Sequence, residues 1–255
     1  MGIVNTTPDS FSDGGQFASD AAAIAHARRL AAEGAMVIDV GGESTRPGGK
    51  PVPAGEELRR VLPVIRALAD DGDVLISIDT YKACVAREAV IAGAHIVNDV
   101  SGLGDPEMAA TCAGLGVPMV LMHMQGTPAT MQISPSYADV VAEVTAHLVA
   151  RSAIAVAAGV PSVLVDPGIG FGKNLTHNRD LLRSLPVEAT WPTLVGVSRK
   201  RSVGEWSGEP DATLLDPGSI AAHLDAARRG VAMVRVHDVA GHVQALAVQS
   251  ALLDD

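Results

Sequence analysis

Short apolar runs alternate along the chain with longer polar or amphipathic segments, and this alternation occurs eight times. The runs are rich in Val, Ile and Leu, which is typical of strands buried on both faces of a parallel sheet. Each run ends on a polar residue or directly before one. The predicted strands cover residues 2–4, 35–40, 74–78, 95–97, 117–122, 162–165, 193–197 and 231–236.

The segments between the apolar runs predict helices. In the second of them Leu58, Val61, Leu62, Ile65 and Leu68 recur at helical spacing and would form one apolar face. Long loops of Gly, Pro, Ser and Thr follow the first two strands, and the stretch around Trp206 has no clear pattern. The predicted helices cover residues 20–33, 56–70, 82–92, 106–115, 137–158, 176–185, 217–229 and 239–253.

The order of these elements indicates an α/β fold. Alternating strands and helices favour a parallel sheet that is covered on both faces. Eight such units in 255 residues are typical of a closed (β/α)8 barrel, the TIM barrel, with an open doubly wound sheet as the alternative. The chain contains no internal repeat and no linker, so we expect residues 1–255 to form a single barrel domain.

The composition agrees with a barrel and narrows the class of partner. Hydrophobic residues make up 47% of the chain and aromatic residues only 3%, so the core must be aliphatic. The net charge of -10 argues against a nucleic-acid or anionic-membrane partner, although a local basic cluster can still bind a small anion. We see no transmembrane run and no signal peptide, and we expect Cys84 and Cys112 to be buried free thiols of a cytoplasmic protein.

Polar residues stand where the predicted strands end. All strands of a parallel barrel point the same way, so their carboxyl ends share one rim, where such enzymes carry their active sites. Any one of these residues could simply cap a helix or hold a loop. As a set they indicate a functional site, which comprises Asn5, Asp39, Asp79, Asn98, His123, Asp166, Lys200, Arg235 and His237.

The chemistry of this rim suggests two kinds of ligand. Three carboxylates, an asparagine amide and the Lys200 ammonium can recognise a flat heterocycle that carries many N–H groups and a carbonyl. Arg46, Arg235 and His237 are suited to phosphate. Asn5 offers an amide oxygen, which is a suitable single protein ligand for Mg²⁺ otherwise held by phosphate and water.

Several short motifs fail on inspection. The run G-I-G-F-G-K at 168–173 has only three residues between its outer glycines and continues with Asn174, so it is not a phosphate-binding P-loop. It also does not fit the G-x-G-x-x-G dinucleotide fingerprint. His123 and His237 do not form a zinc motif. The histidines inside predicted helices are most simply surface or packing residues, namely His26, His147, His223 and His242.

At this point the rim motifs resemble those of the dihydropteroate synthase family, in order and over the whole chain. The resemblance implies a TIM barrel that joins 6-hydroxymethyl-7,8-dihydropterin pyrophosphate to p-aminobenzoate, giving 7,8-dihydropteroate and pyrophosphate in folate biosynthesis. The matching blocks are N-T-T-P-D-S-F-S-D-G-G (5–15), D-V-G-G-E-S-T-R-P-G (39–48), S-I-D-T (77–80), N-D-V-S-G (98–102), D-P-G-I-G-F-G-K (166–173), G-V-S-R-K-R (196–201) and V-R-V-H-D-V (234–239).

The resemblance also implies roles for individual residues. The pterin would be held by Asp79, Asn98, Asp166 and Lys200. The pyrophosphate would be held by Asn5, Arg235 and His237, with Mg²⁺ on Asn5, and p-aminobenzoate would be framed by Thr45, Arg46, Pro47, Phe171 and Ser198. Of these residues we expect Asp79, Lys200 and Arg235 to act in catalysis, with Asp79 favouring positive charge on the pterin as pyrophosphate leaves.

The family resemblance carries further expectations. The first two loops, about residues 6–15 and 42–53, would close over the site, the protein would be a homodimer, and it would be a sulfonamide target. Two other functions stay open: a catalytically silent pterin-binding homologue, and a methyltetrahydrofolate:corrinoid methyltransferase. The family often has Val where this chain has Thr6, a nearly isosteric change from which we expect little effect.

Overall fold

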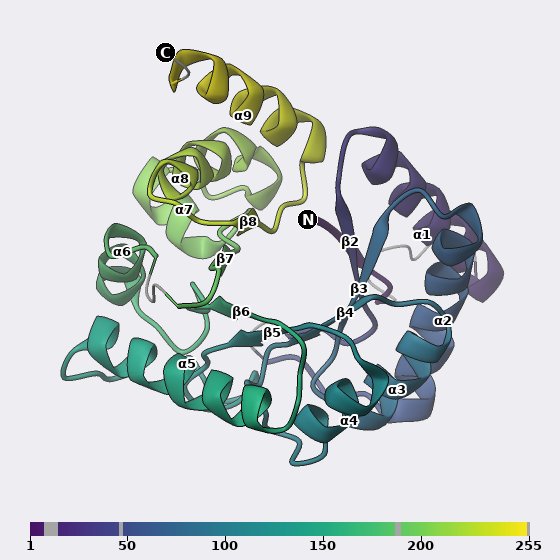
Figure 1. The fold of residues 1–255 in the computed structure, drawn as a ribbon. Coiled ribbons are helices and arrows are strands. Elements are labelled where there is room, and N and C mark those ends of the chain that lie inside the picture. The colour runs from purple at the N-terminus through teal and green to yellow at the C-terminus, as the bar shows by residue number, and fades with distance from the viewer. Residues whose placement is uncertain (8–14, 46–47, 187–189, 254–255) are drawn as a thin grey trace.

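The computed structural model describes residues 1–7, 15–45, 48–186 and 190–253, and the side chains of residues 15–19 are not described. Its strands surround a central axis, and the helices lie outside them (Figure 1). The strands are β1 (Gly2–Asn5), β2 (Val37–Gly41), β3 (Leu75–Asp79), β4 (Ile96–Asp99), β5 (Met119–Met122), β6 (Val163–Asp166), β7 (Leu194–Val195) and β8 (Met233–Val234).

The strands form a closed ring. Strands β1 to β6 make one parallel sheet in sequence order, and β7 pairs with β8. Two parallel bridges join these sheets, one between Val165 and Thr193 and the other between Gly2 and Val236. At the second bridge the Ile3 N–H donates to the Val236 carbonyl at 3.0 Å. The predicted parallel barrel is therefore confirmed, and the open doubly wound sheet is wrong.

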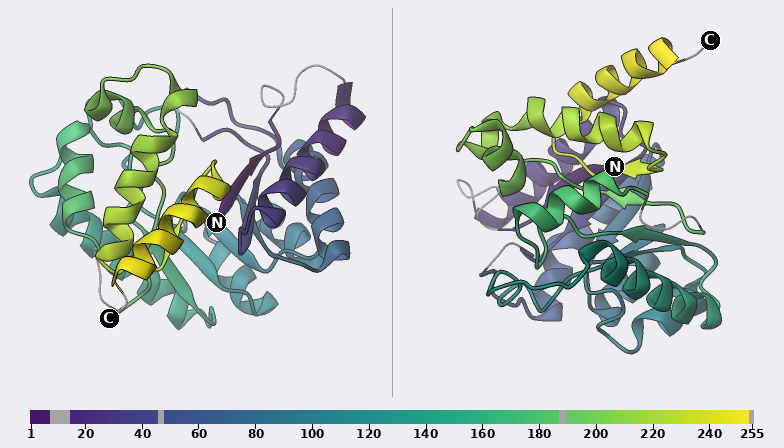
Figure 2. Two further views of the ribbon diagram at one scale, coloured as in Figure 1. Left: turned by 90° about the horizontal axis from the view of Figure 1, so that it is seen from above. Right: turned by 90° about the vertical axis from the view of Figure 1, so that its left-hand side faces the viewer.

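The helices cover the outside of the ring, as both views of Figure 2 show. Their positions agree with the predicted segments except at α7 and the short 3₁₀ helix η2, which form in and just after the stretch around Trp206 that had no clear pattern. The helices are α1 (Gly15–Ala32), α2 (Ala54–Asp71), α3 (Ala83–Ile91), α4 (Met108–Leu115), α5 (Val140–Ala157), α6 (Leu175–Arg183), α7 (Arg201–Ser207), the short 3₁₀ helix η2 (Ala212–Leu214), α8 (Asp216–Arg228) and α9 (Val239–Leu253).

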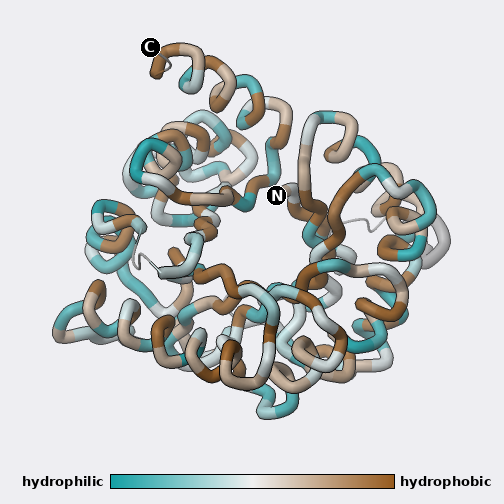
Figure 3. The backbone as a smooth tube through the Cα atoms, in the orientation of Figure 1, coloured by the Kyte–Doolittle hydropathy of each residue, from teal (hydrophilic) through white to brown (hydrophobic). Residues whose placement is uncertain are grey.

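Two apolar regions stabilise the barrel. The larger lies between the strands and the helices, where the apolar faces of the helices meet the outward residues of the strands. The smaller fills the inside of the ring and is entirely aliphatic, as the low aromatic content requires. The strands accordingly carry mostly hydrophobic residues, whereas hydrophobic and hydrophilic residues alternate along the helices (Figure 3). The inner region consists of Val37, Ile96, Val120 and Leu194, with Met1, Leu164 and Met233 packed against them.

Two details differ from the sequence expectations. Helix α5 is long and apolar enough to cross a membrane by length and composition, although the sequence showed no obvious spanning run. It packs against β5 and β6, and 28% of its length is buried within the described structure. Both cysteines are free, but only Cys112 is buried, whereas Cys84 is exposed on α3.

Candidate active site

A cavity opens at the carboxyl ends of the strands, where the polar rim was predicted. The barrel register explains this, because Asn5, Gly41, Asp79 and Asn98 are paired neighbours across β1 to β4. The predicted site residues among the cavity lining are Thr45, Asp79, Asn98, Asp166, Phe171, Ser198, Lys200, Arg235 and His237. The structure thus brings together residues from six strand ends and the loops that follow them.

Three predicted residues within the described part of the chain do not line this cavity, namely Asn5, Asp39 and His123. Arg46 and Pro47 lie outside the described residues. Asn5 is half-buried at the end of β1 and is not among the cavity-lining residues. Its neighbour Thr6 fixes that strand end, because both its backbone N–H and its hydroxyl donate to the Gly41 carbonyl, at 2.8 and 3.0 Å. Thr6 therefore adds a hydrogen bond that a valine lacks.

Arg235 is at the centre of the charged groups in the cavity. Its Nε donates to Oδ2 of Asp39 at 2.6 Å, and its Nη2 donates to Oδ2 of Asp79 at 2.8 Å. The Asn98 amide donates to the same Asp39 oxygen at 3.1 Å. Asp39 is completely buried, and its other oxygen has no hydrogen-bond partner within the described structure. Asp39 therefore lies beneath the cavity, where its carboxylate orients both Arg235 and Asn98.

Burial shifts the ionisation of the groups around this centre. It raises the pKa of Asp79 to about 7, against the nearby Arg235 charge, and the Asp39 carboxylate raises it further. Burial also raises the pKa of Asp166, while Lys200 opposes that shift. Conversely, burial lowers the pKa of Lys200 to about 8 against the attraction of Asp166. Groups that change charge near neutral pH are thus concentrated at one end of the barrel.

The loop after β6 places Lys200 beside an aromatic ring. Lys200 Nζ donates to the Ile169 carbonyl and lies 4.7 Å from the centre of the Phe171 ring, within cation–π range. The turn begins where Oδ1 of Asp166 accepts the Gly168 N–H at 2.7 Å. Gly168 is required there, because it has φ +67° and a Cβ would lie 2.0 Å from the His123 carbonyl oxygen.

Lys173 stabilises the same loop from its buried side. Only 3% of this residue is exposed, and its Nζ donates to the carbonyls of Gly168 and Phe171 at 3.0 and 2.9 Å and contacts His123 Nδ1 at 3.0 Å. Burial lowers the pKa of Lys173 to about 7 and that of His123 to about 3. Lys173 is therefore a packing residue, which agrees with the rejection of the phosphate-loop motif, and His123 does not line the cavity.

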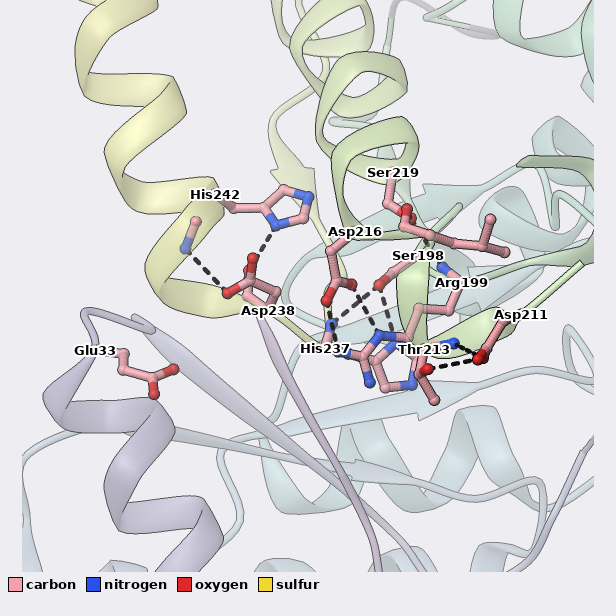
Figure 4. Close-up of polar contacts among 12 residues, drawn as sticks. Glu33, Ser198, Arg199, Asp211, Thr213, Asp216, Ser219, His237, Asp238 and His242 are labelled. Carbon is pink, nitrogen blue, oxygen red and sulfur yellow. Dashed lines mark hydrogen bonds and ion pairs between the residues drawn. The ribbon is translucent and has the colours of Figure 1, made fainter. Parts of the chain in front are cut away.

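Ser198 and His237 connect the ends of β7 and β8. Oγ of Ser198 lies 2.9 Å from Nδ1 of His237 and accepts the His237 backbone N–H at 3.1 Å (Figure 4). The next residue, Arg199, has φ +55°, in the left-handed region that non-glycine residues seldom adopt. Its guanidinium binds Asp216 with two hydrogen bonds of 2.8 and 2.7 Å, which holds the turn against α8.

The base of the loop after β2 is held by buried charges. Lys82 donates to both Glu43 and Glu57, and the Tyr81 hydroxyl donates to Glu43. Glu57 is 1% exposed, and one of its oxygens has no partner within the described structure. Because Glu43 precedes Thr45 by two residues, this cluster determines how the loop enters the cavity.

Sequence reasoning missed four lining residues and underrated one buried residue. The four are Ile3, Val100, Met122 and Gly196, which are apolar or lack a side chain and so gave no chemical signal. Their alternation with the polar rim positions along each strand could have located some of them. Asp39 was placed on the rim but given no role of its own, and only the structure shows that it pairs with Arg235.

Comparison with known proteins identifies the family. Residues 1–237 match the family described as pterin binding enzyme. The chain is 47% identical to the dihydropteroate synthase of Escherichia coli K12 over 257 residues, 99% of this chain and 91% of the relative. It is 48% identical to that of Neisseria meningitidis serogroup C over 262 residues, 99% of this chain and 92% of the relative.

Solved structures of related proteins indicate the same family. The dihydropteroate synthase of Xanthomonas albilineans with 4-aminobenzoic acid superposes with a TM-score of 0.94 at 50% identity, over 100% of this chain and 93% of that one. The same enzyme in complex with 7,8-dihydropteroate has a TM-score of 0.91 at 48% identity, with the same two coverages. The chain therefore belongs to the pterin-binding enzyme family, among its dihydropteroate synthases.

Proposed function

We propose that this chain condenses 6-hydroxymethyl-7,8-dihydropterin pyrophosphate with p-aminobenzoate to give 7,8-dihydropteroate and pyrophosphate. In this transfer the carbon–oxygen bond to pyrophosphate breaks, a carbon–nitrogen bond to the arylamine forms, and the amine loses a proton. The observation that carries the proposal is the gathering of acceptors, an ammonium and a guanidinium around one cavity. Related enzymes have been solved with 4-aminobenzoate, with 7,8-dihydropteroate and with 6HMPPP.

Hydrogen-bond chemistry supports a pterin in the deep part of the cavity. A pterin presents ring and exocyclic N–H groups, which the carboxylates of Asp79 and Asp166 can accept, and a carbonyl, to which Asn98 or Lys200 can donate. Because Asp79 has a pKa of about 7, it is partly protonated near neutral pH. A ligand that donates N–H groups to it favours the ionised form, and this carboxylate can then stabilise positive charge on the pterin.

The cationic groups support departure of pyrophosphate. A guanidinium carries five N–H donors, and the ion pairs of Arg235 with Asp39 and Asp79 use two of them. The other three are available to phosphate oxygens, and His237 lines the same cavity. The arylamine is a neutral nucleophile that needs mainly positioning, for which Phe171, Ser198 and Thr45 are suitably placed. Arg46 and Pro47 are proposed beside them, although they lie outside the described residues.

We also propose that Asn5 contributes to a Mg²⁺ site. The described residues include no group of three or more His, Cys, Asp or Glu side chains that could hold a metal ion. A single neutral amide oxygen fits Mg²⁺, which keeps most of its coordination as water and substrate phosphate. Bound there, the ion would neutralise charge on the leaving pyrophosphate.

We propose further that the protein is a homodimer and works in the cytoplasm as a single barrel domain, with neither nucleic acid nor membrane as partner. Helix α9 packs along α8, and its outer end projects beyond the rest of the molecule in both figures. It exposes four large apolar side chains, Val243, Val248, Leu252 and Leu253. A second copy that covers this face would remove them from water. Sedimentation equilibrium of the wild type and of Leu252→Glu tests this part of the proposal.

The function is tested by incubating the protein with the pterin pyrophosphate and Mg²⁺, with and without p-aminobenzoate. We expect dihydropteroate to form in a one-to-one ratio with released pyrophosphate, and only when both substrates are present. Binding of the pterin without turnover would instead indicate a catalytically silent homologue. Methyl transfer from methyltetrahydrofolate to a corrinoid, with no dihydropteroate formed, would indicate the methyltransferase.

A further inference from the structure

Two buried imidazoles lie directly behind the site without lining it. His223 on α8 is completely buried, and His242 on α9 is 3% exposed. Nδ1 of His223 is 2.8 Å from Nε2 of His242, which is a hydrogen-bond distance. Neither residue borders the cavity. The two rings therefore act on each other and on the backbone, and nothing in the proposed chemistry uses them directly.

The backbone groups at the two ends of this pair determine both tautomers. The Val197 N–H can only donate, and it donates to Nε2 of His223 at 3.1 Å. The Asp238 carbonyl can only accept, and it lies 2.6 Å from Nδ1 of His242. Both rings must therefore carry their proton on Nδ1, and His223 must donate to His242. The result is a relay of three hydrogen bonds that all point the same way, from Val197 to Asp238.

This relay has no place for an additional proton. Protonation of either ring would set two N–H donors against each other at one of the links. Burial lowers the pKa of His223 well below its usual range, helped by His242, Lys200 and the Met1 amino group. Burial also lowers the pKa of His242, although the charges of Asp238 and Asp216 oppose the shift. Both rings are thus neutral whenever the relay is intact.

The relay joins the two turns that carry substrate-binding groups. Val197 precedes Ser198, and Asp238 follows His237. The β7 turn is held against α8 at two further points: the Arg199 N–H donates to Oγ of Ser219 at 3.0 Å, and the Arg199 guanidinium binds Asp216 (Figure 4).

We infer that His223 and His242 are positioning residues. They fix the β7 turn, and so determine the positions from which Ser198 contacts p-aminobenzoate and Lys200 contacts the pterin. This inference rests on the proposed function. A change of the relay would move the β7 turn relative to the β8 turn, and so change substrate affinity without removing any group that contacts substrate.

The tautomers can be tested without an activity measurement. Long-range ¹H–¹⁵N spectra of wild-type protein identify which ring nitrogen carries the proton, and single substitutions assign the signals. We expect His223 and His242 to be neutral and protonated on Nδ1 at pH 7. A proton on Nε2 of either ring, or a doubly protonated ring at that pH, would overturn the relay even if the enzyme is a synthase.

The functional consequence is tested with His223→Leu. The control is His95→Leu, which removes an exposed histidine that likewise accepts a backbone N–H. His95 also accepts a backbone N–H, from Ile76 at 3.1 Å, but it precedes β4 and so lies at the opposite rim of the barrel. We expect His223→Leu to raise the KM for p-aminobenzoate about tenfold or more, and His95→Leu to leave it unchanged. A purely structural role would lower the folded fraction and kcat while KM stayed the same.

If His223→Leu does not fold, His242→Leu keeps the Val197 link while it removes both the acceptor of His223 Nδ1 and the donor to the Asp238 carbonyl. It should raise the same KM by a smaller factor. Wild-type KM values for both substrates in a folded relay variant would refute the positioning role. Absence of dihydropteroate formation by the wild type would refute the proposed function and leave the spectroscopic result standing.

Discussion

The raised pKa of Asp79 predicts that this carboxylate reduces the stability of the barrel at neutral and alkaline pH. Its pKa in the unfolded chain is the ordinary value of 3.8, and in the folded protein it is about 7 because the group is buried. Between these two values the folded state binds more protons than the unfolded state. The Asp79 contribution is therefore fully favourable below pH 3.8 and is lost as the pH rises through about 7.

The expected magnitude follows from the size of the shift. A difference of about three pKa units corresponds to about 4 kcal/mol at 1.36 kcal/mol per unit. This figure is a net cost that already includes the attraction of Arg235. Asp79→Asn removes the charge, and Arg235 keeps Asp39 as its other partner. The amide does not replace every contact of the carboxylate, so the gain is smaller than the full cost. We therefore expect the variant to be more stable than the wild type at pH 8 by about 1–3 kcal/mol, and to lose most of its synthase activity.

Urea unfolding of both proteins at pH 5, 6, 7 and 8 measures this effect, because contributions from other titrating groups cancel in the difference. The extra free energy of unfolding of Asp79→Asn over the wild type should be small at pH 5 and increase toward pH 8. Asp225→Asn is a suitable control, since it removes an exposed carboxylate paired with Arg229 and should change the free energy of unfolding by less than about 0.5 kcal/mol. A stability difference that does not vary with pH, or a less stable Asp79→Asn at pH 8, would refute the reasoning.

Other predictions follow from single contacts. Lys200→Ala should abolish pterin binding in calorimetry while the circular dichroism spectrum is retained, and normal turnover would contradict its assignment. Asn5→Ala should raise the Mg²⁺ concentration needed for half-maximal rate, so an unchanged Mg²⁺ titration would argue against the metal role. Thr6→Val should lower the free energy of unfolding by about 1 kcal/mol because the hydroxyl bond to Gly41 is lost, whereas Thr6→Ser should not. Lys173→Met should destabilise the fold by about 2–3 kcal/mol without weakening pyrophosphate binding, and weaker binding would restore a phosphate role to this loop.

The fold was largely predictable because each barrel strand has a simple sequence pattern, a short apolar run that ends on a polar residue. Apart from Ser77, the runs at 75–79 and 96–99 are apolar up to the rim and polar at it, so one pattern predicts both the strand and its rim residue. Strands β7 and β8 were predicted longer than the two residues that each contains. Their apolar runs continue past the ladder into turns that carry Ser198 and Arg235. Apolar character reports burial, and it does not report regular pairing.

Much of the polar lining of the cavity was predictable residue by residue, but the contacts among those residues were not. The gathering of Asp79, Asn98, Asp166 and Lys200 around one cavity follows from parallel strands of similar length. The pairing of Arg235 with Asp39 could not be predicted, because it depends on the ring closing between the first and last strands. The histidine relay gave no signal either, since a helical histidine that packs and one that positions a turn look alike in sequence. The expectation that Cys84 is buried was wrong, because α3 turns Ala83, Val85, Ala86 and Ala89 toward the core and leaves Cys84 exposed.

The ion pairs of Arg235 also bear on how the protein acquires its site. Arg235 comes from the last strand, while Asp39 and Asp79 lie 196 and 156 residues earlier in the chain. Contacts of such high sequence separation form late, because their loop-closure entropy must be overcome first. During synthesis, strands β1 to β6 can pair before Arg235 exists, but the proposed anion-binding centre cannot form until then. A ligand that requires Arg235 beside these carboxylates binds only the closed ring, so substrate in the cell would act as a folding ligand that selects completed barrels.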